Sequence, residues 1–419
     1  MSLSTQVSKG IRLLSVLALV GLALSMPERP TQAVELADRV SAPPTPASPH
    51  AACDPDQTQA SGAIYRICMP SLPLPFPPWN HDLVVFAHGY VSPTASVAIP
   101  EDQLTLPDGT SIPDAVTMMG YAFATTSYYT NGLAVQQGLA DLVDLVDIFK
   151  AAHPDTNRVY LIGASEGGLI TALAAEQHAD VFNGGAMALC GPVGDFRQQV
   201  NYFGDFRVVF DYFFPGLMPG DPITIPQSLM DNWDTYLAIT VTPALSNTAN
   251  AISVTQLLSV TQAAYDPLDA TSAITTISGL LWYNVFATND AKAKLGGQPF
   301  DNFTRVYSGS LDDAALNAVV QRFTADTPAL SAIQAHYQTV GRPHIPVATM
   351  HNTLDPIVPY WHEILYQNKI EAQGAALMHY NLPVSRYGHC NFDAAEVQVA
   401  LTWLINFRFK VFLPVVLRQ

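Results

Sequence analysis

Charged residues are scarce in this chain. They make up 13% of its 419 residues, whereas 49% are hydrophobic. Basic residues are scarcer still: 19 Lys and Arg stand against 35 Asp and Glu, which gives a formal net charge of −16. We do not expect so acidic a protein to bind nucleic acid through its net field. The hydrophobic content predicts a globular protein with a large core, and the length would allow two or three domains.

An apolar run long enough to span a membrane is also missing. The run from Leu13 to Met26 holds about 14 residues, short of the roughly 20 that a spanning helix needs. It follows Lys9 and Arg12 and precedes small residues around Ala33, which is the layout of a secretory signal peptide rather than of an anchor. We therefore expect residues 1–33 to be removed after Ala33, and the mature protein to be secreted or at the cell surface without a membrane span.

Motifs for metals and cofactors are absent as well. The histidines lack HExxH spacing, the cysteines lack paired spacing, and no Gly-rich loop matches a nucleotide fingerprint. The sequence therefore predicts no metal site and no cofactor.

Only four cysteines are present. Residues 34–52 contain the Pro/Ala/Ser stretch VSAPPTPASP and are expected to be a linker, so the folded part should begin near Cys53. In an exported protein Cys53 and Cys68, which flank a short segment, are expected to pair. Cys190 and Cys390 either form a second bridge near the active site or are buried thiols.

The most informative segment is GASEG at residues 163–167, a GxSxG sequence. The apolar, β-branched residues 159–162 before it predict a buried parallel strand, and apolar residues at helical spacing after it predict a helix over 168–178. Glycines beside a nucleophile let the strand and helix approach each other around a strained turn. This context favours Ser165 as a nucleophile over a serine in an ordinary Gly-rich turn.

A nucleophilic serine needs a histidine to take its proton and an acid to orient that histidine. Asp355 follows a predicted strand over 345–350, and His389 follows another over 377–382. Both therefore lie where a doubly wound sheet presents functional groups. The predicted triad is Ser165, His389 and Asp355.

Other acids and histidines were weighed against these. Asp312 and Asp313 precede the strand at 345–350, and an acidic pair in that position is typical of a helix N-terminal cap. His351 and His362 are interpreted as packing or supporting residues.

The order GxSxG, LDPxVP and GHCNF resembles the α/β-hydrolase superfamily over about residues 62–190 and 345–408. The motifs are also similar to those of secreted bacterial esterases and of prolyl-oligopeptidase-like catalytic domains, although no repeated N-terminal domain precedes them. The resemblance implies an α/β fold with a mainly parallel, doubly wound sheet. It also implies an oxyanion hole made by the backbone N–H groups of Glu166 and of Tyr90, with Val91 as the alternative to Tyr90.

The side chain of Glu166 is unusual beside a nucleophile. It is expected to be a solvated carboxylate stabilised by the helix dipole, and the alternative is an anchor for a substrate amine.

The strand–helix rhythm stops for about 150 residues after Gly191. We expect an α/β-hydrolase core at 53–190 and 345–419, with a large, mostly helical cap inserted at 191–344. Phe206, Phe210 and Trp282 in this cap are expected to line an apolar pocket; the alternative is that they form the core of the cap itself.

The sequence thus predicts a secreted serine hydrolase that cleaves small-molecule carboxylic esters of apolar substrates through an acyl-enzyme. The alternatives are a serine exopeptidase or amidase of prolyl-oligopeptidase-like type, and a non-catalytic surface module that keeps the fold.

Overall fold

The structure is a computed structural model that describes residues 51–71 and 77–407. The expected signal peptide at 1–33 and nearly all of the expected linker at 34–52 lie outside the described residues. Ala51 and Ala52, which were assigned to the linker, belong instead to the first strand.

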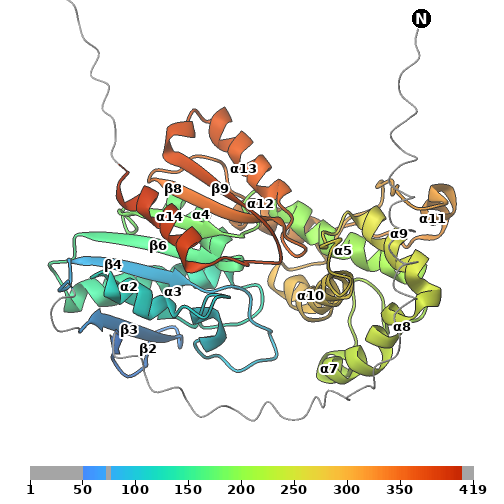
Figure 1. Ribbon diagram of the computed structural model, residues 1–419, viewed down its shortest axis with the longest axis horizontal. Helices are drawn as coiled ribbons and strands as arrows, with labels where there is room; N and C mark the ends of the chain where they lie inside the picture. Colours follow the sequence, from blue (N-terminus) through green and yellow to red (C-terminus); the bar gives the residue numbers. More distant parts are fainter. Residues whose placement is uncertain (1–50, 72–76, 408–419) are drawn as a thin grey trace, which may run out of the picture. The chain divides into compact units, whose positions relative to one another are not determined.

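A nine-stranded sheet forms the centre of the described fold (Figure 1). Its strands are β1 (Ala51–Cys53), β2 (Gln57–Thr58), β3 (Ile64–Pro70), β4 (Asp82–Ala87), β5 (Ala122–Thr126), β6 (Arg158–Ala164), β7 (Gly185–Leu189), β8 (Val347–Leu354) and β9 (His379–Tyr387). The spatial order is β1-β3-β5-β4-β6-β7-β8-β9, with β2 paired to β3. All neighbours from β5 to β9 are parallel. This confirms the mainly parallel sheet.

The three N-terminal strands are antiparallel additions that the sequence did not predict. β1 and β2 both pair with β3, and β3 pairs with β5. Cys53 and Cys68 lie directly opposite each other in β1 and β3, and the structure joins them in a disulfide.

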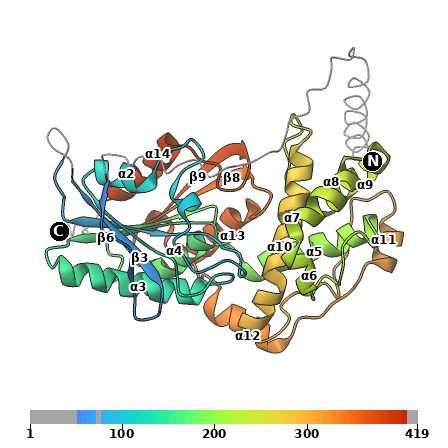
Figure 2. The ribbon, with the colours of Figure 1, turned by 90° about the horizontal axis from the view of Figure 1, so that it is seen from below.

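Helices cover both faces of the sheet, so its central strands are buried and apolar. One face packs against α3 (Val135–Ala152), α4 (Glu166–Gln177) and α13 (Trp361–Ala372). The other packs against α2 (Ile112–Met118) and α14 (Ala394–Ile405). Figure 2 shows α3 and α14 on opposite sides of the strands. The sheet is therefore doubly wound, as expected.

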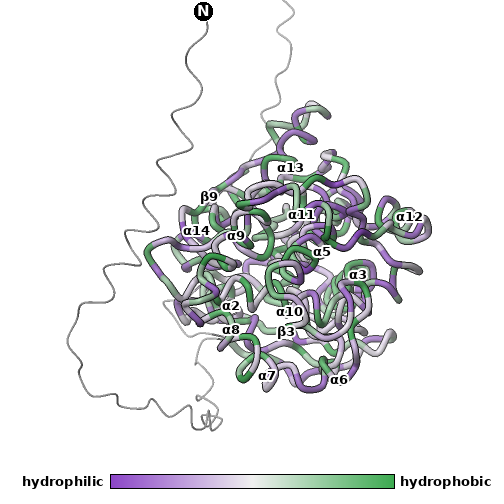
Figure 3. The backbone as a smooth tube through the Cα atoms, turned by 90° about the vertical axis from the view of Figure 1, so that its right-hand side faces the viewer, coloured by the Kyte–Doolittle hydropathy of each residue, from purple (hydrophilic) through white to green (hydrophobic). Residues whose placement is uncertain are grey.

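Between β7 and β8, residues 191–344 form helices and no strand of the sheet; we call them the cap. The main cap helices are α5 (Phe196–Phe213), α6 (Gln227–Asp231), α7 (Trp233–Tyr236), α8 (Thr242–Ser246), α9 (Ala251–Thr261), α10 (Ser272–Lys294), α11 (Asp313–Val319) and α12 (Thr327–His336). They enclose a separate aromatic and aliphatic core. Along the cap helices and the helices of the sheet, hydrophobic and hydrophilic residues are interleaved (Figure 3). Within residues 51–71 and 77–407, no helix has both the length and the apolar character needed to cross a membrane.

Candidate active site

Ser165 is the single residue between strand β6 and helix α4. Its backbone lies at φ 57° and ψ −118°, a region that non-glycine residues rarely adopt. The turn is tight on both sides: a Cβ atom on Gly163 would lie 2.1 Å from the Gly167 carbonyl oxygen, and one on Gly167 would lie 2.0 Å from the Ala87 carbonyl oxygen. Both outer glycines of GxSxG are therefore required by close packing, and the sharp turn presents Ser165 at the carboxyl end of the sheet.

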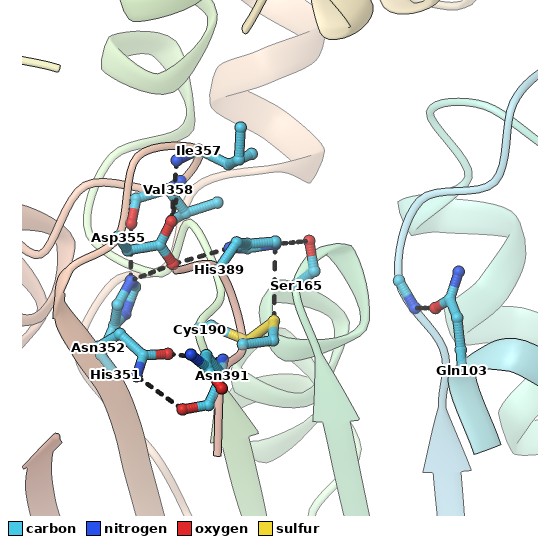
Figure 4. Close-up of a disulfide and its surroundings, with 12 residues drawn as sticks. Gln103, Ser165, Cys190, His351, Asn352, Asp355, Ile357, Val358, His389 and Asn391 are labelled. Atoms are coloured by element: carbon cyan, nitrogen blue, oxygen red, sulfur yellow. Dashed lines mark hydrogen bonds and ion pairs between the residues drawn. A yellow bond between two sulfur atoms is a disulfide. The ribbon is translucent and has the colours of Figure 1, made fainter. Parts of the chain in front are cut away.

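The structure brings Ser165, His389 and Asp355 together in one line of hydrogen bonds (Figure 4). His389 Nε2 lies 2.8 Å from Ser165 Oγ, and His389 Nδ1 lies 2.7 Å from Asp355 Oδ2. The other carboxylate oxygen of Asp355 accepts hydrogen bonds from the amides of Ile357 and Val358, at 2.8 and 3.0 Å. These four contacts fix the orientation of both Asp355 and His389.

Asp355 is held as a carboxylate. It is fully buried, and burial alone would raise its pKa; His389 and His351 beside it outweigh burial and lower the pKa of Asp355 to about 2. A serine hydroxyl, an imidazole and an ionised carboxylate thus lie in sequence, an arrangement that can activate the hydroxyl for nucleophilic attack.

The loop that carries His389 is fastened to its surroundings in two ways: by an asparagine pair that no motif revealed, and by a disulfide that the sequence left as one of two alternatives. The backbone N–H of Asn391 donates to Asn352 Oδ1 at 2.8 Å, and Asn352 Nδ2 donates to the backbone carbonyl of Asn391 at 2.9 Å. Cys390 is bonded to Cys190, which follows β7. These sulfurs are bonded to each other, so they are not thiolate ligands for a metal.

The two predicted oxyanion donors lie beside Ser165. Tyr90 and Glu166 line the same cavity as Ser165. In the described part of the chain, neither of their backbone N–H groups donates to another protein group. The loop before Tyr90 is held by Gln103, which accepts a hydrogen bond from the Gly89 amide at 2.7 Å (Figure 4).

The side chain of Glu166 is not solvated, which corrects the expectation. Its Oε1 accepts a hydrogen bond from the Ala134 amide at 2.8 Å, while its Oε2 is buried and has no partner among the described residues. Burial raises the pKa of Glu166 to about 8. The cap causes this burial: Asp290 of α10 accepts a hydrogen bond from the Leu133 amide at 2.7 Å, and Lys294 binds the Asn131 carbonyl.

Ser165 lies at the meeting point of two cavities. The first lies under the cap and is lined mainly by apolar side chains, including Phe196, Val200 and Phe203 of α5. The second is lined by core loops and includes His389. Tyr283 of α10 lines both cavities.

The predicted pocket residues Phe206, Phe210 and Trp282 line neither cavity. Phe206 and Phe210 are fully buried in the cap core, and Trp282 packs against the rings of Tyr90 and Phe286. The physical reason is position along α5. The residues of α5 that line the first cavity all lie between 196 and 204, whereas Phe206 and Phe210 lie in the C-terminal half of the helix, inside the cap core.

The competing residues have structural roles. Asp312 caps α11 by accepting a hydrogen bond from the Ala315 amide at 2.9 Å, and Asp313 binds the Ser310 hydroxyl and amide. His362 is buried against the loop before α5 and against Gln199.

The chain is similar to one known protein family and to several solved structures. Residues 133–278 match the family described as serine aminopeptidase, S33. This stretch contains the Ser165 turn and the following strand, and it extends into α10. The chain has the α/β-hydrolase fold. No curated protein matches the chain.

The chain is also similar to several solved structures. Acylaminoacyl peptidase from Pyrococcus horikoshii aligns at 10% identity and a TM-score of 0.40, over 81% of this chain and 37% of the peptidase. A ligand-bound form of the rice cell wall degrading esterase LipA from Xanthomonas oryzae aligns at 12% identity and a TM-score of 0.42, over 84% of this chain and 86% of the esterase. Feruloyl esterase B from Aspergillus oryzae aligns at 12% identity and a TM-score of 0.42, over 83% of this chain and 80% of that esterase. The chain spans little more than a third of the peptidase, and likenesses this distant carry no argument about activity.

Proposed function

We propose that this α/β-hydrolase is a serine hydrolase that cleaves carboxylic esters of apolar, uncharged small molecules through an acyl-enzyme. The observation that carries the proposal is the hydrogen-bonded series from Ser165 through His389 to Asp355, built on the tight turn after β6.

In the proposed reaction His389 takes the Ser165 proton as Oγ attacks the ester carbonyl. The negative charge that develops on the carbonyl oxygen is stabilised by the amides of Tyr90 and Glu166. Asp355 stabilises the imidazolium, which then gives its proton to the departing alcohol oxygen. Water, deprotonated by His389, hydrolyses the acyl-enzyme and restores Ser165.

The two cavities support an assignment of substrate parts. The leaving alcohol must lie next to His389, which protonates it, and the second cavity contains His389. The first cavity, under the cap, is lined mainly by apolar side chains and suits an apolar acyl group.

A second candidate is cleavage of aminoacyl amides or peptides, and Glu166 favours it. Its buried Oε2 has no protein partner, and Glu166 lines the first cavity beside Ser165. An ammonium group on the acyl carbon next to the carbonyl would provide such a partner.

Parallel assays with p-nitrophenyl esters and aminoacyl p-nitroanilides separate these functions. The ester proposal expects the higher kcat/KM for apolar p-nitrophenyl esters, and loss of this activity in Ser165→Ala. A preference for the anilides would favour the peptidase function, and activity on neither class would favour a non-catalytic module.

We also propose that the hydrolase is exported, which its two disulfides support. N-terminal sequencing of protein from the culture medium tests this, and a mature chain that begins near residue 34 is the expected result.

A further inference from the structure

Two histidines are completely buried near Asp355, and their surroundings are opposite in kind. His351 lies in β8, and His362 lies on α13. The hydrogen-bond partners of each ring determine which of its nitrogens must carry a proton.

His362 is surrounded as a neutral imidazole. Its Nδ1 accepts hydrogen bonds from the backbone amides of Gly194 and Asp195, at 3.1 and 3.3 Å, so this nitrogen carries no proton. Its Nε2 lies 2.8 Å from Gln199 Oε1 and donates to it. Burial lowers the pKa of His362 well below its usual value.

His351 meets only acceptors. Its Nε2 lies 2.7 Å from the Val358 carbonyl oxygen and 3.3 Å from Asp355 Oδ2. Its Nδ1 lies 3.2 Å from Glu363 Oε1. A carbonyl and two carboxylates offer no proton, so both ring nitrogens must donate, and the ring is an imidazolium.

We propose that His351 is a permanently charged positioning residue: as an imidazolium paired with Glu363 it holds Asp355 from behind, and its charge opposes protonation of His389. The inference rests on the proposed triad, and it extends the hydrogen-bonded series from Ser165 to Glu363.

The groups around His351 are consistent with one buried cation. Glu363 of α13 also accepts a hydrogen bond from Asn381 of β9, and the ring of Tyr360 meets His351 edge-on at 5.9 Å. From the cap side, the Tyr202 hydroxyl donates a hydrogen bond to the Pro356 carbonyl and is uncharged. The remaining titratable neighbours are Asp355, neutral His362 and, beyond Asp355, His389. Burial would lower the pKa of His351, but Asp355 and Glu363 outweigh burial and raise it to about 10.

The charge on His351 affects the triad through Asp355 Oδ2, which contacts both histidines. When His389 gains a proton, two cations share one carboxylate, and the existing cation opposes the new one. Removal of the His351 charge should therefore make protonation of His389 easier. Since the protonated form cannot act as a base, activity should then be lost at a higher pH.

The first test is the pH dependence of ester kcat/KM in His351→Gln, with His362→Gln as the matched control for a buried histidine. Glutamine can still donate to Val358 or Asp355 but carries no charge. The acid limb should move to higher pH by about one unit in His351→Gln, and it should stay in place in His362→Gln. An unmoved acid limb in folded His351→Gln, or an equal shift in the control, would overturn the proposal.

The second test does not depend on whether a substituted protein folds. Side-chain ¹⁵N NMR of the histidine-labelled enzyme should show one histidine ring with both nitrogens protonated from pH 5 to 9. This ring is assigned to His351 by its absence from the His351→Gln spectrum or by its coupling to Glu363. No such doubly protonated ring at pH 7 would overturn the proposal. This readout does not depend on the triad, so a failure of the proposed function, seen as activity retained in Ser165→Ala, is distinguishable from a failure of this inference.

Discussion

The sulfur of Cys390 lies 3.5 Å from Nε2 of His389, the nitrogen that faces Ser165. Cys390 follows His389 in the chain and is bonded to Cys190 at the end of β7. The bridge thus connects the loop that carries the proposed base directly to the sheet. This resolves, in favour of the bridge, the two alternatives left open by the sequence.

Loss of this disulfide should reduce activity more than loss of the other one. In the double variant Cys190→Ala/Cys390→Ala we expect kcat for ester hydrolysis to fall by about 10- to 100-fold, because the His389 loop is less well positioned. The control is Cys53→Ala/Cys68→Ala, which removes the bridge between β1 and β3. Both pairs should lower the free energy of unfolding by roughly 2–4 kcal/mol. Equal kcat values in the two pairs would show that the bridge near His389 is only structural.

The acid of the triad can be tested by removing one charge. Asp355→Asn should lower kcat by about 10³-fold or more, because an amide does not stabilise the His389 imidazolium and favours the wrong tautomer. Asp312→Asn is the control, since Asp312 caps α11. Steady-state kinetics of the two variants give the answer, and a greater loss in Asp312→Asn would move the acid into the cap.

Two phenylalanines of α5 should separate binding from stability. Phe203 lines the cavity under the cap, whereas Phe210 is fully buried in the cap core. Phe203→Ala should raise KM for apolar esters roughly tenfold with little change in stability. Phe210→Ala should lower the free energy of unfolding by roughly 3–5 kcal/mol. Kinetics together with urea unfolding test both, and the reverse pattern would return Phe210 to the pocket.

Glu166 should make stability depend on pH. Because burial raises its pKa to about 8, the folded state keeps a proton between pH 5 and 8 that the unfolded state has already lost. Its contribution to stability therefore falls as the pH rises through this range. Glu166→Gln cannot ionise, so it should be more stable than the wild type by an amount that grows to the order of 4 kcal/mol at pH 8. Glu371→Gln, at an exposed carboxylate, is the control. The free energy of unfolding of both variants is measured with urea at pH 5 and 8.5. The same change in stability in the two variants would contradict the account.

Local patterns predicted the central part of the fold well. The strands from β4 to β7 are largely apolar runs. The turn at Ser165 is marked by Gly163 and Gly167, where a Cβ atom would lie less than 2.5 Å from a neighbouring carbonyl oxygen. β1 and β2 were not predicted, because strands of three and two exposed or half-buried residues show no clear alternation. They form through pairing with β3, which a local pattern does not reveal.

Errors at the site arose where burial depends on distant segments. Glu166 appears exposed in its own sequence context, but the Ala134 amide and the α10 residues that close over the loop before α3 bury it. The position along α5 decides which aromatics reach the cavity, and the sequence does not show that the cavity ends near residue 204. The Asn352–Asn391 pair joins residues 39 positions apart and left no motif.

The most direct test of the proposed function is covalent labelling with a p-nitrophenyl phosphonate ester. The Ser165 oxygen should form a bond to phosphorus as p-nitrophenolate departs, with His389 taking the serine proton. Intact mass spectrometry should then show one phosphonyl group per chain, peptide mapping should place it on Ser165, and Ser165→Ala should remain unlabelled. Equal labelling of Ser165→Ala, or a phosphonyl group on another residue, would contradict the account.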